Sequence, residues 1–181
     1  MKKYFAILII LFVCLASCKR KQEDIIADVK KKYTEINQKL TDYKPKRVDD
    51  LTNSGGGSIT GYYREEEVKK VVAEHFTDST RSFIECYFDD GMLIMIWKQN
   101  YVYNRTMSYT EERARANGDS VWYDDKKTKV QTNLFYFNKN KLVKWVNINN
   151  ADVKPGTAEF IDMESVLWGE TAILLKQLKE Q

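Results

Sequence analysis

The sequence predicts an α+β fold in which an antiparallel meander of about six to eight strands lies between two helices. Two observations predict it. First, a pair of apolar residues that brackets four others occurs three times, as hairpins with short turns would require, at Tyr63–Val68, Phe88–Leu93 and Phe137–Leu142. Second, the segments before and after this repeat carry apolar residues at the helical spacing of three and four.

The clearest hairpin runs from Ser79 to Tyr103. Two runs of strand-forming residues flank Asp90-Gly91, a dipeptide typical of a two-residue type I′ turn. Counting outward from this turn places Phe88 opposite Leu93, Cys86 opposite Met95 and Ile84 opposite Trp97. Side chains alternate along a strand, so we expect all six on one core-facing side of the sheet. The apolar run from Met92 to Trp97 predicts a central strand covered on both faces.

The N-terminus predicts a secretory signal peptide over residues 1–17. Lys2 and Lys3 are followed by an apolar run of 12 residues from Tyr4 to Leu15. This run is too short to span a bilayer core, which needs about 20 residues, but it has the length of a signal-peptide apolar region. We expect residues 18–181 to form a single mature domain.

The cleavage region, Leu15-Ala16-Ser17-Cys18, resembles the lipobox of the bacterial lipoprotein family. The resemblance implies that Cys18 becomes the mature N-terminus and carries a thioether-linked diacylglycerol, with an added N-acyl chain such as palmitate. Two or more acyl chains anchor a protein stably, whereas one holds it only marginally. Because Lys19 rather than Asp follows the cysteine, the family's sorting habits imply the outer membrane; they leave the periplasmic and surface-facing sides open.

Residues 23–43 predict an amphipathic helix. Its apolar residues recur at spacings of three and four, at Ile26, Val29, Tyr33, Ile36, Leu40 and Tyr43. This stripe covers only about three heptads, so packing on the protein's own sheet is favoured over a coiled coil with a partner. The Gly-rich segment within 44–58 predicts a flexible connector.

The sheet is expected over residues 59–150. Its regular pattern is interrupted between Asn104 and Asn117, where Thr110 to Ala116 predicts a short helix ended by Asn117-Gly118. Trp122 to Asp125 is a candidate start of an irregular strand. From 162 to 179 the spacing is helical again, and the face expected to pack on the sheet carries Met163, Val166, Leu167, Leu174 and Leu178.

Charge and motif content argue against several functions. The net charge of +3 gives no basis for nucleic-acid binding. His75 is the only histidine, and no Gly-x-Ser-x-Gly, His-Glu-x-x-His or Cys-x-x-Cys motif occurs, so we expect no enzyme, metal site or cofactor. Cys86 is the one cysteine of the mature domain beyond Cys18 and is expected to be a buried, inert thiol.

Two short motifs, Asp78-Ser79-Thr80 and Asp119-Ser120-Val121, resemble the O-glycosylation sequence of Bacteroidota, in which Asp is followed by Ser or Thr and then by an apolar residue. They place candidate modification sites at Ser79 and Ser120, each in a segment expected to be a loop. The repeated hairpins also resemble uncharacterised Bacteroidota lipoproteins, a resemblance that implies no chemistry.

These features predict a membrane-anchored envelope lipoprotein that acts as a non-catalytic binding or structural module, with an envelope protein as a candidate partner. The alternative is a carrier or chaperone that encloses an acyl chain or other apolar ligand between sheet and helix, loosely resembling the half-barrel of lipoprotein-sorting factors. In that case the ligand would be lined by Met92, Met95, Trp97 and Trp145. An envelope hydrolase is a third hypothesis that no motif favours.

Overall fold

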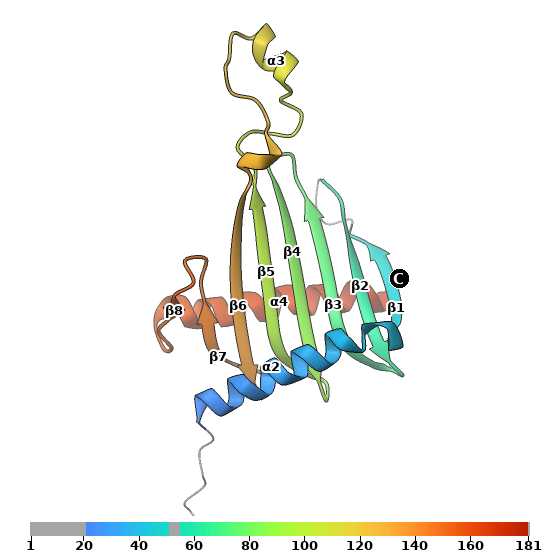
Figure 1. The fold of residues 1–181 in the computed structure, drawn as a ribbon. Helices are drawn as coiled ribbons and strands as arrows, with labels where there is room; N and C mark the ends of the chain where they lie inside the picture. The colour runs from blue at the N-terminus through green and yellow to red at the C-terminus, as the bar shows by residue number, and fades with distance from the viewer. Residues whose placement is uncertain (1–20, 51–54, 181) are drawn as a thin grey trace, which may run out of the picture.

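The computed structural model describes residues 21–50 and 55–180. Within these ranges one antiparallel sheet of eight strands is formed, and each strand pairs with its neighbours in the sequence (Figure 1). The predicted α+β meander is thereby confirmed, while the predicted signal peptide and Cys18 lie outside the described residues. The strands are β1 Lys44–Asp49, β2 Gly57–Arg64, β3 Glu67–Phe76, β4 Thr80–Asp89, β5 Met92–Val102, β6 Lys129–Asn138, β7 Lys141–Val146 and β8 Asp152–Val153.

Three hairpins of this sheet share one geometry. The predicted pairs all form, with Tyr63 opposite Val68, Phe88 opposite Leu93 and Phe137 opposite Leu142. Beyond each pair the register shifts by one residue, so that each returning strand contains a β-bulge; the extra residues are Lys69, Ile94 and Val143. Asp90 and Gly91 have φ values of 48° and 70°, and the type I′ turn requires such positive values at both positions.

The bulge at Ile94 corrects the register that we predicted for the central hairpin. Cys86 lies opposite Ile96 rather than Met95, and Trp97 lies opposite Glu85 rather than Ile84. One extra residue moves every later side chain of the strand to the other face. Ile84, Cys86, Phe88 and Leu93 therefore share a face as predicted, whereas Met95 and Trp97 lie on the opposite one.

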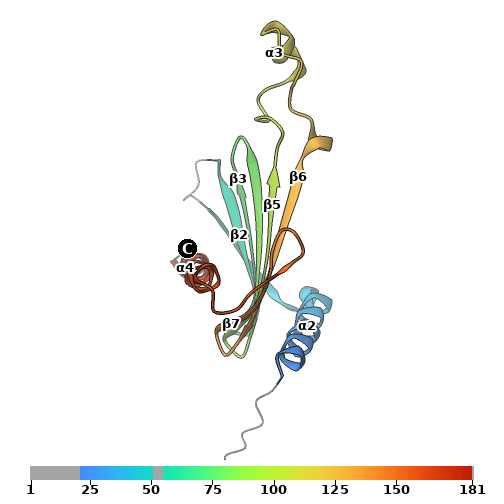
Figure 2. The same ribbon diagram turned by 90° about the vertical axis from the view of Figure 1, so that its left-hand side faces the viewer.

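Two helices cover opposite faces of the sheet, α2 (Gln22–Gln38) and α4 (Ala158–Glu180), as Figure 2 shows. Buried apolar side chains accordingly form two clusters. The α4-side cluster includes Ile59, Val71, Cys86, Ile96, Phe135, Phe137, Leu167 and Leu178, and the α2-side cluster includes Val29, Ile36, Tyr87, Ile94, Met95 and Tyr136. The central strand β5 contributes to both clusters, as its apolar run predicted.

The first helix packs on the protein's own sheet, as the sequence favoured. Val29 and Ile36 are buried against it, and the Tyr33 ring meets the Tyr87 ring edge-on at 4.8 Å between centroids. The helix ends at Gln38 rather than at residue 43, because a 3₁₀ turn, η1 (Leu40–Asp42), continues the apolar spacing while it redirects the chain into β1.

The C-terminal helix begins four residues earlier than predicted and continues through Gly169. Thr157 precedes it, and its Oγ1 accepts a hydrogen bond from the Phe160 amide at 3.3 Å, which caps the first turn. The face toward the sheet carries Phe160, Leu167, Thr171, Leu174 and Leu178. Val166 was predicted on this face but is 51% exposed, because it lies one position before Leu167 on the turn.

Two connecting segments also differ from the sequence prediction. Part of the expected connector 44–58 forms β1, an edge strand in which Val48 is buried and Pro45 is exposed. Trp122 to Asp125 is not a strand; the chain there leads into a second 3₁₀ turn, η2 (Asp125–Lys127). The predicted short helix is α3 (Glu111–Ala116), capped by Thr110, and it projects beyond the end of the sheet (Figure 1).

Within the described ranges, none of the helices combines the length and apolar character needed to cross a membrane.

Candidate functional site

The long strands extend beyond the helices that cover the sheet. Strands β3 to β6 have 10 or 11 residues each, and at about 3.3 Å per residue they span about 33–36 Å. A helix with its side chains is only about 10 Å wide. Both helices cross the end of the sheet that carries the hairpin turns, and the other end extends past them toward α3 (Figures 1 and 2).

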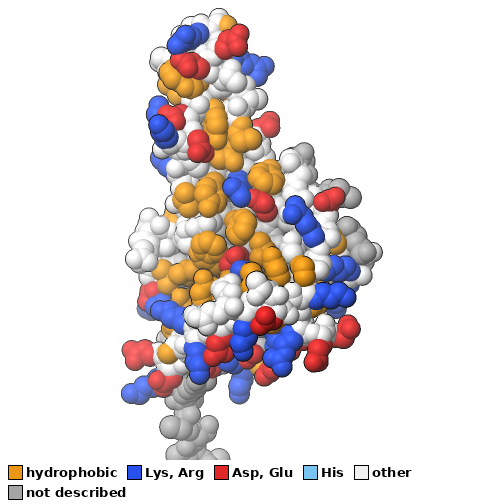
Figure 3. Space-filling view, turned by 45° about the vertical axis from the view of Figure 1, so that its right-hand side comes forward, with side chains coloured by type: hydrophobic (Ala, Val, Ile, Leu, Met, Phe, Trp, Pro, Cys, Tyr) orange, Lys and Arg blue, Asp and Glu red, His pale blue; other side chains and the backbone are white. Residues whose placement is uncertain are grey.

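The uncovered end carries apolar side chains on the face that α2 occupies lower down. Residues directly opposite on neighbouring strands share a face, so Trp97 stands beside Leu134, and Tyr101 stands beside Val130. Figure 3 shows hydrophobic side chains gathered over this part of the molecule. We call this set the aromatic surface; its members are Val72, Phe76, Phe83, Trp97, Tyr101, Val130 and Leu134.

Contacts among neighbouring strands hold the rings of the aromatic surface. The Phe83 and Trp97 rings meet edge-on with centroids 6.4 Å apart. The Arg81 guanidinium lies 5.6 Å from the Phe76 ring centroid and 5.6 Å from the Tyr101 ring centroid, and it is paired with Glu74. Phe76 is 36% exposed and Val130 is 52% exposed, whereas the other five members are half-buried, so the surface is partly open to solvent.

A groove of about 450 Å³ lies where the aromatic surface meets α2. Its floor is a buried polar cluster centred on Lys70, which is 4% exposed. The Lys70 ammonium lies 2.8 Å from Glu85 Oε1 and donates to Asn37 Oδ1 at 3.0 Å. The same ammonium lies 4.9 Å from the Tyr87 ring centroid, and the Tyr87 hydroxyl donates to Glu85. Trp97 also lines this groove and so joins it to the aromatic surface.

Burial raises the pKa of Tyr87 far above its usual value, and the hydrogen bond to Glu85 raises it further. The hydroxyl therefore stays protonated at neutral pH and keeps donating to the carboxylate. Because Lys70 also pairs with that carboxylate, the polar groups of the floor satisfy one another. The cluster fixes the edge of α2 to β3 and β4 and leaves the aromatic rings as the groups that face outward.

The four residues that we predicted to line a carrier cavity do not come together. Met95 and Trp145 are each 5% exposed, but they belong to the α2-side and α4-side clusters respectively. Met92 begins β5 beside the turn and is 37% exposed. Trp97 lines the groove at the edge of α2, on the face opposite Trp145.

The other predicted sites fall in several places. Ser79 and Ser120 are both exposed and lie outside regular elements, where a modifying enzyme can reach them. Cys86 is 1% exposed, and burial raises the pKa of its thiol to about 12, so it is an inert core residue. His75 lies with Nδ1 2.6 Å from the buried Asp50 carboxylate. The described residues contain no cluster of three or more His, Cys, Asp or Glu side chains suited to a metal ion.

Sequence reasoning missed Phe83, Tyr101 and Arg81 as members of a surface. Aromatic residues favour strands whether their side chains are buried or exposed, so the sequence alone could not show which of these rings lie on the surface. One signal was present: strand pairing sets Arg81 between Phe76 and Tyr101, and a register corrected for the bulge would have placed this cation among aromatic rings.

Comparison with known proteins adds no family to this description. The chain matches no protein-family model, no curated protein and no solved structure. Its function is therefore inferred from the surface itself and from the N-terminal motif.

Proposed function

We propose that the chain is a lipid-anchored protein of the bacterial envelope that binds a protein partner through the aromatic surface and has no catalytic role. The aromatic surface is the observation that carries the proposal, because apolar side chains that gather on one face and are exposed there, as Phe76 and Val130 are (Figure 3), mark an interaction site. The lipobox supports the anchor, on Cys18, and Lys19 beside it supports the outer membrane.

The start of α2, which closely follows the proposed anchor in the sequence, and the aromatic surface lie at opposite ends of the molecule (Figure 1). Only Lys19, Arg20 and Lys21 lie between Cys18 and the first residue of α2. The start of α2 lies at the end of the molecule that carries the hairpin turns, whereas the aromatic surface lies toward α3 (Figure 1). A chain anchored at Cys18 therefore holds its hairpin turns near the bilayer and presents the aromatic surface away from it.

The chemistry of the aromatic surface favours a protein partner. Trp, Tyr, Phe and Arg are enriched at the centres of protein interfaces, where ring area gives affinity at a small cost in side-chain entropy. Arg81 and Glu74 lie among these rings, and moving such a pair into hydrocarbon would be costly. We therefore infer a partner with an apolar area of its own, which stands in the envelope at a distance from the anchoring bilayer.

The anchor is tested by labelling cells with a tagged fatty acid. We expect the wild-type chain to incorporate the label and to sediment with membranes, because Cys18 supplies the only thiol in the lipobox. The Cys18→Ala variant should do neither, and Cys86→Ala is the matched control that should keep both. Label retained by Cys18→Ala would show that the anchor is assigned wrongly.

The partner is tested by affinity purification from detergent-solubilised envelopes, followed by binding measurements with the recovered protein. We expect Tyr101→Ser to weaken binding by about tenfold or more, the range for truncating a central interface aromatic. Ile161→Ser is the matched control, since Ile161 is 56% exposed and lies on α4 on the other face of the sheet. Equal affinities for the wild type and Tyr101→Ser would contradict the assignment of this surface.

A further inference from the structure

The first hairpin departs from the other two at its β-bulge. The extra residues Ile94 and Val143 are aliphatic and pack in the α2-side cluster. The first hairpin has Lys69 at the equivalent position, and Lys69 is only 7% exposed. Burying an ammonium group where the repeat otherwise places an aliphatic side chain costs stability, unless an anion compensates the charge.

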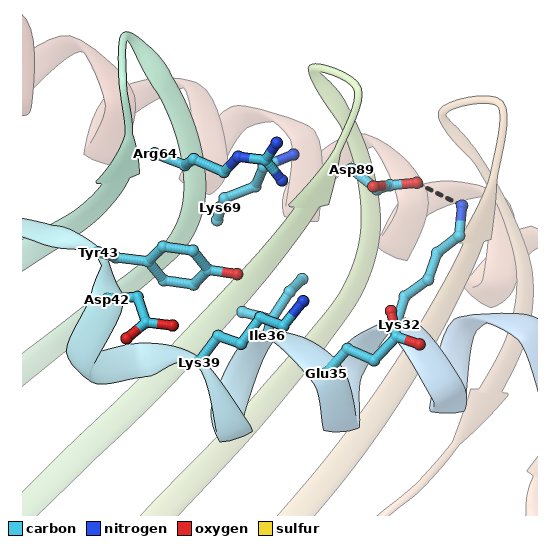
Figure 4. Close-up of a pocket in the computed structure, with 9 residues that line it drawn as sticks. All are labelled: Lys32, Glu35, Ile36, Lys39, Asp42, Tyr43, Arg64, Lys69 and Asp89. Carbon is cyan, nitrogen blue, oxygen red and sulfur yellow. Dashed lines mark hydrogen bonds and ion pairs between the residues drawn. The ribbon is translucent and has the colours of Figure 1, made fainter.

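Lys69 lines a pocket of about 420 Å³ between the end of α2 and the turns of the first two hairpins (Figure 4). Arg64, at the end of β2, reaches the same hollow, as do Lys39, which follows α2, and Tyr43, which precedes β1. In the close-up the Arg64 and Lys69 side chains extend over the hollow from one side, and the Tyr43 hydroxyl points into it. Separate segments of the chain thus bring cationic groups and one hydroxyl to a single space.

Two of the four cations that line this pocket are held in ion pairs within the chain. Lys32 is held by Asp89, and Lys69 lies 2.7 Å from Glu67, which also accepts a hydrogen bond from the Gly91 amide. Neither Arg64 nor Lys39 forms an ion pair with any part of the chain that the structure describes.

Two further carboxylates, Asp42 and Glu35, line the pocket from the α2 side, and both residues are exposed to solvent. With Asp89 and Glu67, these carboxylates equal the four cations in number, so the pocket has no excess charge. The feature that suits an anion is the placement of Arg64 and Lys69 together, on the side of the pocket away from Asp42 and Glu35 (Figure 4).

We propose that this pocket binds a phosphate group, with Arg64, Lys69 and Lys39 as its cationic ligands and the Tyr43 hydroxyl as a further donor. A guanidinium matches two phosphate oxygens at once, and an ammonium adds a compact point charge. The pocket is larger than a phosphate ion, so a phosphate ester fits as well. Two sources share this chemistry: a soluble phosphate compound, and the headgroup of an anionic phospholipid, which the hairpin turns would approach in an anchored chain.

The proposal is tested with the full chain in uncharged detergent and two probes, inorganic phosphate and phosphatidylglycerol added as mixed micelles. We expect calorimetric titration to detect binding that Arg64→Gln and Lys69→Ile weaken by about tenfold or more, the range for losing a charge-assisted hydrogen bond. Lys176→Gln is the matched control, because Lys176 is exposed on α4 and pairs with Glu180. Binding of inorganic phosphate assigns the phosphate group itself, and binding of phosphatidylglycerol alone assigns the lipid headgroup.

The Lys69→Ile variant separates a binding role from a structural one. It restores the aliphatic residue that the other hairpins carry at the bulge, so we expect a higher thermal unfolding midpoint together with the loss of binding. A lower midpoint would show that Lys69 serves the fold, and it would overturn the proposal. Failure of both probes to bind, or equal weakening by Lys176→Gln, would overturn it too. Neither readout depends on a protein partner, so these outcomes are independent of the proposed function.

Discussion

Gly91 shows how one residue sets the geometry of the central hairpin. Its φ of 70° lies in the left-handed region, and a Cβ built on it meets no atom within 4 Å. A substitution is therefore limited by backbone conformation rather than by space. Gly91→Val should lower the free energy of unfolding by more than about 1 kcal/mol, measured by chemical denaturation of the chain from Lys19 onward.

Gly169 provides the control for this substitution. It lies within α4, where a Cβ also meets no atom within 4 Å, but its backbone is helical. Gly169→Ala should raise the free energy of unfolding by about 0.5–1 kcal/mol. Equal effects of the two substitutions would mean that the turn at Gly91 is not the element we describe.

The extra residue of the central β-bulge could not be identified from the sequence. The turn pairs around Asp90-Gly91 were predicted correctly because turn chemistry and alternation both specify them. The bulge was not predicted because Ile94, Met95 and Ile96 are all apolar, so no break in alternation shows which residue is extra. The error moved Met95 and Trp97 to the wrong face and, with them, the predicted carrier cavity.

The buried ion pair between Lys70 and Glu85 connects strands β3 and β4 beneath α2. Their side chains are 6% and 13% exposed, and the ammonium and carboxylate are 2.8 Å apart. Glu85→Gln would leave Lys70 buried without its counter-charge, so it should lower the free energy of unfolding by about 3–5 kcal/mol. Denaturant titration measures this, and adding Lys70→Met should recover most of the loss.

An exposed ion pair on α2 gives the contrast. Lys31 and Glu35 are 75% and 52% exposed, and Lys31→Ala should change the free energy of unfolding by no more than about 0.5 kcal/mol. A Glu85→Gln effect as small as that of Lys31→Ala would contradict the view that the polar cluster fixes α2 to the sheet.

Helices and strands in which apolar residues recur at a regular spacing were predicted better than elements without such a pattern. The helical spacing identified both α2 and α4, and only their ends were displaced, by a 3₁₀ turn in one case and by the Thr157 cap in the other. The strand β1 was missed because a polar edge strand with Val48 as its one buried residue has no alternation to detect. Its assignment depends on pairing with β2, which is a tertiary contact.

The aromatic surface is a property of the whole molecule, and for that reason the sequence did not reveal it. The apolar residues of β3 to β6 were readily identified as strand residues. Whether each is covered depends on where α2 crosses the sheet, and this follows from packing between segments that are distant in the chain. The predicted lipobox, in contrast, is a local pattern of four residues; it stays a prediction, because Cys18 lies outside the described residues.

The proposed function places a protein partner on the aromatic surface. Site-specific photo-cross-linking in cells tests it most directly, with the photoreactive residue placed at Val130 or at Ile161. These positions are 52% and 56% exposed, but only Val130 belongs to the aromatic surface. We expect a discrete adduct with one envelope protein at Val130, none with that protein at Ile161, and loss of the Val130 adduct when Tyr101→Ser is added. No adduct at Val130, or the same adduct at both positions, would contradict the claim.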